Sequence, residues 1–271
     1  MRVISILSTK GGVGKTTIAS NLALALQSFG RPTVLLDFNF TTPHVSLYFN
    51  LLQAEKTLNN FLKNECSFND IIYRHSSGLS IVPTSLSLND VVSIDGNLKN
   101  VIEENLKNFE FVIIDSAPGL GREAIISLNS CQEAIFVATP DFVSVFDVAK
   151  TYKLINNLPE KPIVLGIILN RVKGKSYEMR REEVERYSGL PVLAEIKESE
   201  TFLKSLSLRT PAFFFDKNVS ETFKQLAAKI AGIPYEKEKM IDKILKILGL
   251  RRWWEIFFFC FFFLFLFFKF L

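Results

Sequence analysis

Cysteine and histidine are scarce in this chain. The three cysteines, Cys66, Cys131 and Cys260, lie far apart and show no metal-ligand spacing. Such usage argues against a disulfide framework and is typical of free thiols in a reducing compartment. The two histidines, His44 and His75, have no evident catalytic partners, and no pair of carboxylates stands out. The composition therefore gives no sign of a Ser/His/Asp hydrolase or of a paired-carboxylate enzyme.

A large excess of one charge is also missing. The 32 lysine and arginine residues outnumber the 28 aspartate and glutamate residues only slightly, which gives a formal net charge of +4. This balance does not by itself predict nucleic-acid binding, because basic residues must cluster on one surface to have that effect. The N-terminus lacks the charged, apolar and small-residue pattern of a secretory signal, so we expect none.

Hydrophobic residues, by contrast, are abundant. They make up 48% of the 271 residues, and 26 of them are phenylalanine, with many of these near the C-terminus. A chain of this length can bury one large α/β core and still carry an appendage.

Short apolar runs alternate with helical stretches as far as about residue 235. Nearly continuous apolar runs are typical of strands that helices cover on both faces. The predicted strands span Val3–Leu7, Thr33–Asp37, Leu79–Pro83, Phe111–Asp115, Ala134–Ala138, Ile163–Leu169 and Val192–Ala194. The predicted helices span Lys15–Phe29, Leu98–Asn108, Ser144–Asn156, Ser176–Ser188 and Ser220–Ala231. This alternation predicts an α/β fold, a doubly wound and mostly parallel sheet with helices on both faces.

The strongest motif lies between the first strand and the first helix, at Ser8–Thr17. Its glycines let the backbone curl so that several N–H groups point at an anion, and the helix adds its positive N-terminal end. Lys15 can reach the β- and γ-phosphates of a nucleotide, and the Thr16 hydroxyl is placed to bind Mg²⁺. The alternative, a glycine-rich turn without a ligand, fits this strand–loop–helix context poorly.

The motif is a variant, because Thr9 stands where the common pattern has glycine. Lys10–Thr16 resembles the deviant Walker A motif of the MinD/ParA ATPases. The resemblance extends from Met1 to about Pro234 and includes Leu35–Asp37, Val112–Gly119 and Ile168–Arg171, and within the family it is greatest to archaeal MinD-like proteins. It implies a P-loop ATPase that uses ATP and Mg²⁺ and forms an ATP-dependent homodimer.

The resemblance also assigns roles to single residues. The nucleotide-binding residues are Gly11, Gly12, Val13, Gly14, Lys15, Thr16, Thr17 and Asn170, the metal ligands are Thr16 and Asp115, and the catalytic residues are Lys10, Lys15, Asp37 and Asn39. Lys10 would reach across the dimer to the partner's nucleotide, although a contact within one subunit or a solvated lysine remains the alternative. Asp115 could instead cap the next segment, and Asn170 could be a turn former rather than an adenine ligand.

The switch segment departs from the family pattern at one position. Many members of the family have a second acid two residues after the position of Asp37, whereas this chain has Asn39. An amide can hydrogen-bond a water molecule but cannot accept its proton. We therefore expect slow turnover that depends on Asp37, Lys10 and an activator.

The chain changes character after residue 234. The predicted organisation is a P-loop ATPase domain over 1–234, a charged linker and basic amphipathic helix over 235–252, and a Phe-rich tail over 253–271. A basic amphipathic helix is typical of a membrane surface. The apolar run 256–268 would give only about 20 Å of helix, short of the ~30 Å hydrocarbon core, whereas 253–271 gives about 28 Å. A surface helix, a single span, a helix packed on its own domain and a sequence artefact therefore all remain open.

These features lead to a positioning switch as the main hypothesis. ATP would join two subunits, whose tails would hold the cytoplasmic face of a membrane peripherally or as a single-span anchor. The cellular structure, such as a division site, and the activator or cargo protein are not identified by the sequence. The alternatives are a ParA-like partitioning ATPase that binds DNA non-specifically and a non-hydrolysing ATP-dependent scaffold. Acidic residues interleave with the basic residues at 178–185, so DNA is a weaker candidate partner than the membrane.

Overall fold

The computed structural model describes residues 1–87 and 98–235 of the chain. Met1–Ile233 form one compact unit, and Pro234–Leu271 form a second unit. Only Pro234 and Tyr235 of the second unit are described, so the predicted amphipathic helix and Phe-rich tail lie outside the described residues. Within the described part of the chain, no helix combines the length and apolarity that crossing a bilayer requires.

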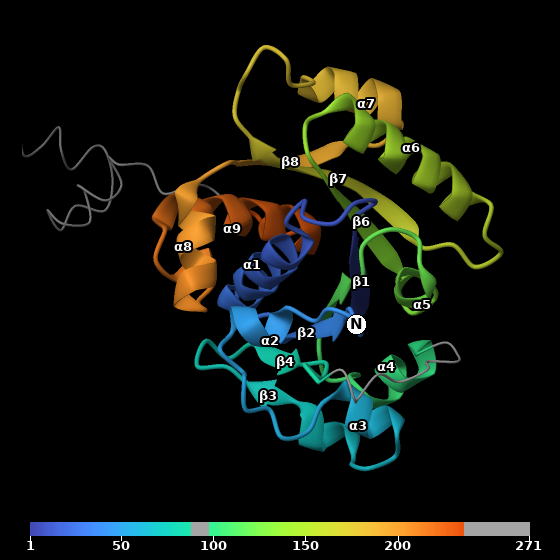
Figure 1. Cartoon of the computed structure of the whole chain (residues 1–271), viewed down its shortest axis with the longest axis vertical. Helices are drawn as coiled ribbons and strands as arrows, with labels where there is room; N and C mark the ends of the chain where they lie inside the picture. Colours follow the sequence, from blue (N-terminus) through green and yellow to red (C-terminus); the bar gives the residue numbers. More distant parts are fainter. Residues whose placement is uncertain (88–97, 236–271) are drawn as a thin grey trace, which may run out of the picture. The chain divides into compact units, whose positions relative to one another are not determined.

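The first unit is built on an eight-stranded sheet with the strand order β3-β4-β2-β5-β1-β6-β7-β8 (Figure 1). The strands are β1 Arg2–Leu7, β2 Thr33–Phe38, β3 Tyr73–Arg74, β4 Ser80–Val82, β5 Phe111–Ser116, β6 Glu133–Ala138, β7 Ile163–Val172 and β8 Val192–Lys197. All neighbouring pairs are parallel except the short β3, which pairs antiparallel with β4 at one edge. The predicted mostly parallel sheet is therefore confirmed.

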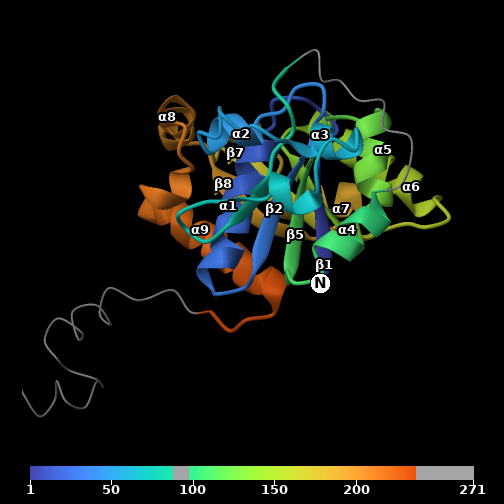
Figure 2. The same ribbon diagram turned by 90° about the horizontal axis from the view of Figure 1, so that it is seen from below.

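Helices cover both faces of this sheet (Figures 1 and 2). They are α1 Lys15–Ser28, α2 Val45–Tyr48, α3 Leu58–Leu62, α4 Lys99–Asn105, α5 Arg122–Asn129, α6 Phe142–Asn156, α7 Arg181–Ser188, α8 Glu200–Leu208 and α9 Lys217–Ala231, with short 3-10 turns η1 Phe68–Ile71 and η3 Ala212–Phe214. One core cluster joins α1 and α9 to one face, and two further clusters join α4 to α7 to the other.

The alternation of side chains along β1 explains this two-sided packing. Ile4 and Ile6 belong to the cluster around α1 and α9, whereas Val3 and Leu7 belong to the clusters on the opposite face. Successive strand residues point to opposite faces, so a strand with helices on both sides must be apolar at nearly every position. The apolar runs of the sequence are therefore the central strands.

Arg2 ties the start of β1 to distant parts of the unit. Its guanidinium donates two 3.0 Å hydrogen bonds to Glu133 on β6 and also hydrogen-bonds the carbonyl of Ile230 on α9. The same group lies 5.5 Å from the ring centre of Phe111 on β5. The first strand is thus fixed both within the sheet and to the last helix.

One predicted helix begins later than expected. The prediction placed a helix over Ser176–Ser188, whereas α7 begins at Arg181. The carboxylate of Glu178 instead accepts hydrogen bonds from the backbone N–H groups of Lys173, Gly174 and Lys175, at 2.7 to 3.1 Å. This local capping holds the segment in a turn, because it gives the backbone donors a partner outside any helix.

Candidate functional site

The loop between β1 and α1 is shaped by glycines with left-handed backbone angles. Gly12 has φ of 76° and Gly14, which caps α1, has φ of 94°. A Cβ atom added at Gly11 or Gly12 would meet nothing within 4 Å, so the space in front of the loop is open. The first turn of α1 contains no acidic residue that would compete with an anion for the helix N-terminus.

Lys15, Thr16 and Asp115 meet at the mouth of this loop. The Lys15 ammonium donates to Asp115 Oδ1 at 2.8 Å, and the Thr16 hydroxyl donates to Asp115 Oδ2 at 2.6 Å. Lys15 is 7% exposed and Asp115 is fully buried. The structure therefore places the predicted phosphate lysine and both predicted metal ligands within one hydrogen-bonded group.

Asp37 lies beside Asp115, because the two residues are paired in the register of β2 and β5. Its carboxylate accepts hydrogen bonds from the backbone N–H groups of Asn39 at 3.0 Å and of His44 and Val45 at 3.1 Å. Burial, together with the neighbouring charge of Asp115, raises the pKa of Asp37 to about 7. Asp37 therefore fixes the start of the switch segment and adds a second acid to the site.

Asn39 lines the cavity around the phosphate loop, but its side-chain amide is engaged in the turn that follows β2. The Nδ2 atom donates to the carbonyl of Thr42 at 2.6 Å, and the Oδ1 atom accepts from the backbone N–H and hydroxyl of Thr42 at 3.2 Å. The side chain is 4% exposed. In this arrangement the amide stabilises the switch turn, and its predicted contact with water stays a prediction.

Lys10 lies on the outer side of the loop. Its ammonium is 3.6 Å from Asp147 on α6, and the two side chains are 40% and 36% exposed. An ion pair this exposed contributes little to stability, so the lysine is held only weakly.

Asn170 ends the central part of β7 and reaches the phosphate loop. Its Nδ2 atom donates to the carbonyl of Val13 at 2.7 Å, which leaves its Oδ1 atom as an acceptor. A Cβ atom at Gly14 would lie only 2.3 Å from the same Nδ2 atom. Asn170 therefore braces the loop, and it also lines a cavity beside α8.

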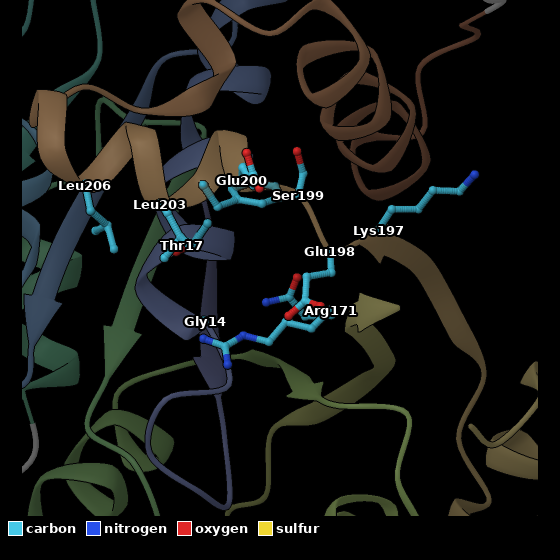
Figure 3. A pocket seen from close by; sticks show the side chains of 11 residues that line it. Gly14, Thr17, Arg171, Lys197, Glu198, Ser199, Glu200, Leu203 and Leu206 are labelled. Atoms are coloured by element: carbon cyan, nitrogen blue, oxygen red, sulfur yellow. The ribbon is translucent and has the colours of Figure 1, made fainter. Parts of the chain in front are cut away.

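Two cavities adjoin at this edge of the sheet. A cavity of about 580 Å³ surrounds the loop and is lined by Val13, Thr16 and Thr17 among others. A second cavity of about 420 Å³ lies between the ends of β7 and β8 and helix α8 (Figure 3). Gly14, Thr17, Arg171 and Leu206 line both. Both cavities combine polar and apolar lining residues, and two adjoining cavities of this size can together hold the phosphates and the base of one nucleotide.

The residues present fit magnesium and a triphosphate. Lys10, Lys15, Arg171 and Arg209 line the larger cavity, and no carboxylate of the described residues does so. Thr16 lines this cavity and offers a hydroxyl oxygen to Mg²⁺, and the buried Asp115 carboxylate is hydrogen-bonded to that hydroxyl. Mg²⁺ prefers oxygen ligands and commonly takes only one or two from the protein beside the phosphates. Within the described part of the chain, no group of three His, Cys, Asp or Glu residues is placed to hold a metal ion.

Three residues of the site were missed by the sequence interpretation. The Tyr48 hydroxyl lies 3.3 Å from the Thr17 hydroxyl and 3.2 Å from that of Ser205 on α8, and Tyr48 is 2% exposed. Arg171 and Arg209 line the cavities with left-handed backbone angles. Arg171 stands in the Ile168–Arg171 stretch of the resemblance but was given no role there, and no motif marks Tyr48 or Arg209, because the fold alone brings α2 and the end of α8 to the loop.

Comparisons with known proteins agree with this site. The ParA family model, described as NUBPL iron-transfer P-loop NTPase, matches residues 1–231. An uncharacterized ATP-binding protein of Methanocaldococcus jannaschii is 33% identical over 257 residues, which cover 90% of this chain and 97% of that protein.

Solved structures are also similar. The cell division ATPase MinD of Pyrococcus furiosus has a TM-score of 0.79 at 29% identity, covering 85% of this chain and 98% of that chain. The septum site-determining protein MinD of Pyrococcus horikoshii, complexed with Mg-ADP, has a TM-score of 0.78 at 28% identity, covering 84% and 95%. Together with the site, these matches identify ATP and Mg²⁺ as the ligands and ATP hydrolysis as the activity. The chain belongs to the MinD/ParA family of P-loop ATPases.

Proposed function

We propose that the protein is an ATP-driven positioning switch that pairs with a second copy of itself and associates with a membrane through its C-terminal residues. The observation that carries this proposal is the phosphate site, in which Lys15 and Asp115 are paired at 2.8 Å while Lys10 is held weakly at the rim. Similarity to proteins described as a cell division ATPase and a septum site-determining protein supports a role in positioning.

Each residue of the phosphate site would have a separate role in hydrolysis. Lys15 would leave Asp115 to hold the β- and γ-phosphates, while the Thr16 hydroxyl and the Asp115 carboxylate would hold Mg²⁺. Magnesium supplies neutralisation of the charge that develops on the transferred phosphoryl group. Asp37 fixes the switch segment through three backbone N–H groups, so the segment that follows it can respond to the γ-phosphate.

Lys10 is the residue that would couple ATP to dimerisation. Its 3.6 Å pair with Asp147 is partly exposed, and a pair of this kind can open at little cost. Once released, the ammonium could reach the nucleotide of a second subunit and stabilise its γ-phosphate, as an arginine finger does. ATP would then hold two subunits face to face.

The membrane contact belongs to residues outside the described part of the chain. The stretch 240–252 is basic and amphipathic in sequence, and 253–271 is almost entirely aromatic and aliphatic. A single weak anchor gives marginal binding, whereas two anchors in a dimer act together through their effective concentration. Dimerisation would therefore switch membrane association, with the cytoplasmic face as its location.

The ion pairs in and around α7 make DNA binding the weaker alternative. Arg181 pairs with Glu185 at 3.2 Å, Arg180 with Glu183 at 3.5 Å, and Lys173 with Glu198 at 3.2 Å. These pairs partly neutralise the local basic cluster, and non-specific DNA binding depends on basic residues that are free to neutralise phosphates.

Liposome flotation tests the proposal directly. We expect the full chain to float with anionic liposomes in the presence of Mg-ATP and to remain in solution with Mg-ADP. A chain ending before Met240 should bind ATP with unchanged affinity and fail to float, which serves as the matched control. Flotation that is equal with ATP, ADP and no nucleotide would overturn the switch and indicate a permanent anchor. A salt-sensitive, ATP-dependent shift of a DNA fragment without flotation would favour the partitioning alternative.

A further inference from the structure

Arg171 occupies the junction between the two cavities of the site. It lies next to Asn170 at the end of β7 and lines both the phosphate cavity and the cavity beside α8. Figure 3 shows its side chain extending from the strand toward Gly14, the residue at which the phosphate loop becomes α1. A nucleotide with its base in one cavity and its phosphates in the other must pass this side chain.

The backbone at Arg171 is held in an unfavourable conformation. Its φ is 60°, a left-handed value that few residues other than glycine adopt, and such values persist only where the surroundings enforce them. On one side Asn170 is bonded to Val13, and on the other the carbonyl of Val172 accepts from the N–H of Glu198 at 3.0 Å. The strand register with β8 shifts between Asn170 and Val172, at this residue. The fold thus turns the side chain at 171 toward the cleft.

The guanidinium of Arg171 has no hydrogen-bond or ion-pair partner among the described residues. The nearby carboxylate of Glu198 is taken by Lys173 at 3.2 Å, although Glu198 lines the same cavity as Arg171. By contrast, Lys15 is paired with Asp115 and Lys10 with Asp147. A planar guanidinium without a protein partner at this place is suited to the two oxygens of a phosphate group.

We propose that Arg171 binds the α-phosphate of the nucleotide, the group that joins the phosphate tail to the sugar at the junction of the cavities. The proposal rests on the nucleotide site alone and needs neither dimerisation nor a membrane. The α-phosphate is present in ATP and in ADP, so this contact holds substrate and product alike. Arg171 therefore contributes uniform binding, which sets KM and product retention rather than the rate of the chemical step.

The test compares Arg171→Gln and Arg171→Lys with the wild-type full chain. We expect Arg171→Gln to raise the Kd of both Mg-ATP and Mg-ADP by about tenfold, a factor typical of a lost charge-assisted hydrogen bond. Arg171→Lys should recover part of the affinity because it keeps the charge and loses the planar fork. In steady-state turnover KM should rise while kcat stays within about twofold or increases, since ADP leaves faster.

Controls separate this effect from folding and from general charge. Arg186→Gln removes the same charge from α7, where the side chain lies over Tyr187 and lines neither cavity, and it should leave both Kd values unchanged. Arg171→Gly allows the left-handed backbone without a side chain, so it should lose affinity without losing thermal stability.

Three results would overturn the proposal. A rise in the Kd of ATP with no change for ADP would place Arg171 at the γ-phosphate. Unchanged Kd values for both nucleotides would make it a surface arginine. An equal loss of affinity for adenosine, measured by competition, would show that the guanidinium stacks on the base instead.

Discussion

The phosphate side of the cleft, around Lys15, and the base side, beside α8, differ in how far their side chains are bonded to one another. On the phosphate side, Lys15, Thr16 and Asp115 are bonded to one another at 2.6 to 2.8 Å, and Asp115 is fully buried. At the junction between the two sides, Arg171 has no partner among the described residues, and on the base side the α8 residues Leu203 and Leu206 are 67% and 54% exposed.

This difference indicates how the site divides affinity and chemistry. Charged groups that are already buried side by side need no further desolvation when Lys15 moves from Asp115 to the phosphates, which favours catalysis. Exposed leucines and a free guanidinium gain their contacts only when a ligand covers them, which favours binding. We therefore expect changes on the phosphate side to remove activity and changes on the base side to weaken affinity.

The largest effect is expected from Lys15→Ala, which removes the centre of the phosphate side. The change deletes the buried ammonium that would hold the β- and γ-phosphates, and losing a buried charge pair with the ligand costs about 3 kcal/mol or more, equivalent to at least about 100-fold in ATP affinity. Calorimetric titration with Mg-ATP should detect no binding at micromolar concentrations, and ATPase activity should fall to background.

Lys10→Ala is the matched control for that variant. It removes a lysine of the same loop that is 40% exposed, so ATP should still bind while turnover falls. If Lys15→Ala retained wild-type affinity in a folded protein, the phosphate side would lose its assigned role.

A smaller effect is expected from Gly14→Ala, at the point where the two sides touch. The new Cβ would lie 2.3 Å from Asn170 Nδ2 at a residue whose φ is 94°, so both strain and a clash act against it. Such strain typically costs on the order of 2–3 kcal/mol, or about 5–10 °C in Tm for a domain of this size. Differential scanning calorimetry without nucleotide measures this directly.

Two neighbouring glycines separate the contributions of strain and clash. Gly12→Ala introduces strain alone, since φ is 76° and nothing lies within 4 Å, and should lower Tm by less. Gly11→Ala introduces neither and should leave the Tm of the nucleotide-free protein nearly unchanged. Equal shifts in all three variants would contradict the close approach of Asn170 to the loop.

The smallest effect is expected from Asn39→Asp, in the switch segment. The carboxylate would lose the hydrogen bond that Nδ2 donates to the carbonyl of Thr42 at 2.6 Å, so the turn should loosen by about 1 kcal/mol. We expect a drop in Tm of about 2–4 °C and no gain in ATPase rate. A clear rise in kcat would instead show that the missing acid limits hydrolysis and that the hydrogen bonds of the Asn39 side chain within the turn are dispensable.

The central strands could be predicted because burial on both faces forces a continuous apolar sequence. β1, β2, β5, β6 and β7 begin and end within three residues of their predicted bounds. The two-residue β3 and the short helices α2 and α3 could not be predicted, since they depend on tertiary contacts rather than on local preference. The start of α7 was wrong because Glu178 caps the preceding turn through three backbone N–H groups.

The phosphate side of the site was predictable for a similar reason. Its residues stand in one continuous motif and at the ends of apolar strands, and the structure brings Lys15, Thr16 and Asp115 together. On the base side, the sequence marked only the Ile168–Arg171 stretch and gave a role only to Asn170. A left-handed backbone at Arg171 and a hydroxyl contact between Tyr48 and Ser205 arise only when segments far apart in the chain meet.

Because β1 lies in the middle of the sheet, the region around the phosphate loop can assemble only after both neighbouring strands of β1 have been synthesised. The ribosome releases the phosphate loop early, yet both neighbours of β1 lie between residues 111 and 138, and Asp115 is 100 residues beyond Lys15. The hydrogen bond from Arg2 to the carbonyl of Ile230 on α9 can form only later still. A nascent chain can therefore pair β1 with both of its neighbours only after residue 138 has left the ribosome, and it can form the contact between Arg2 and Ile230 only after α9 has been synthesised.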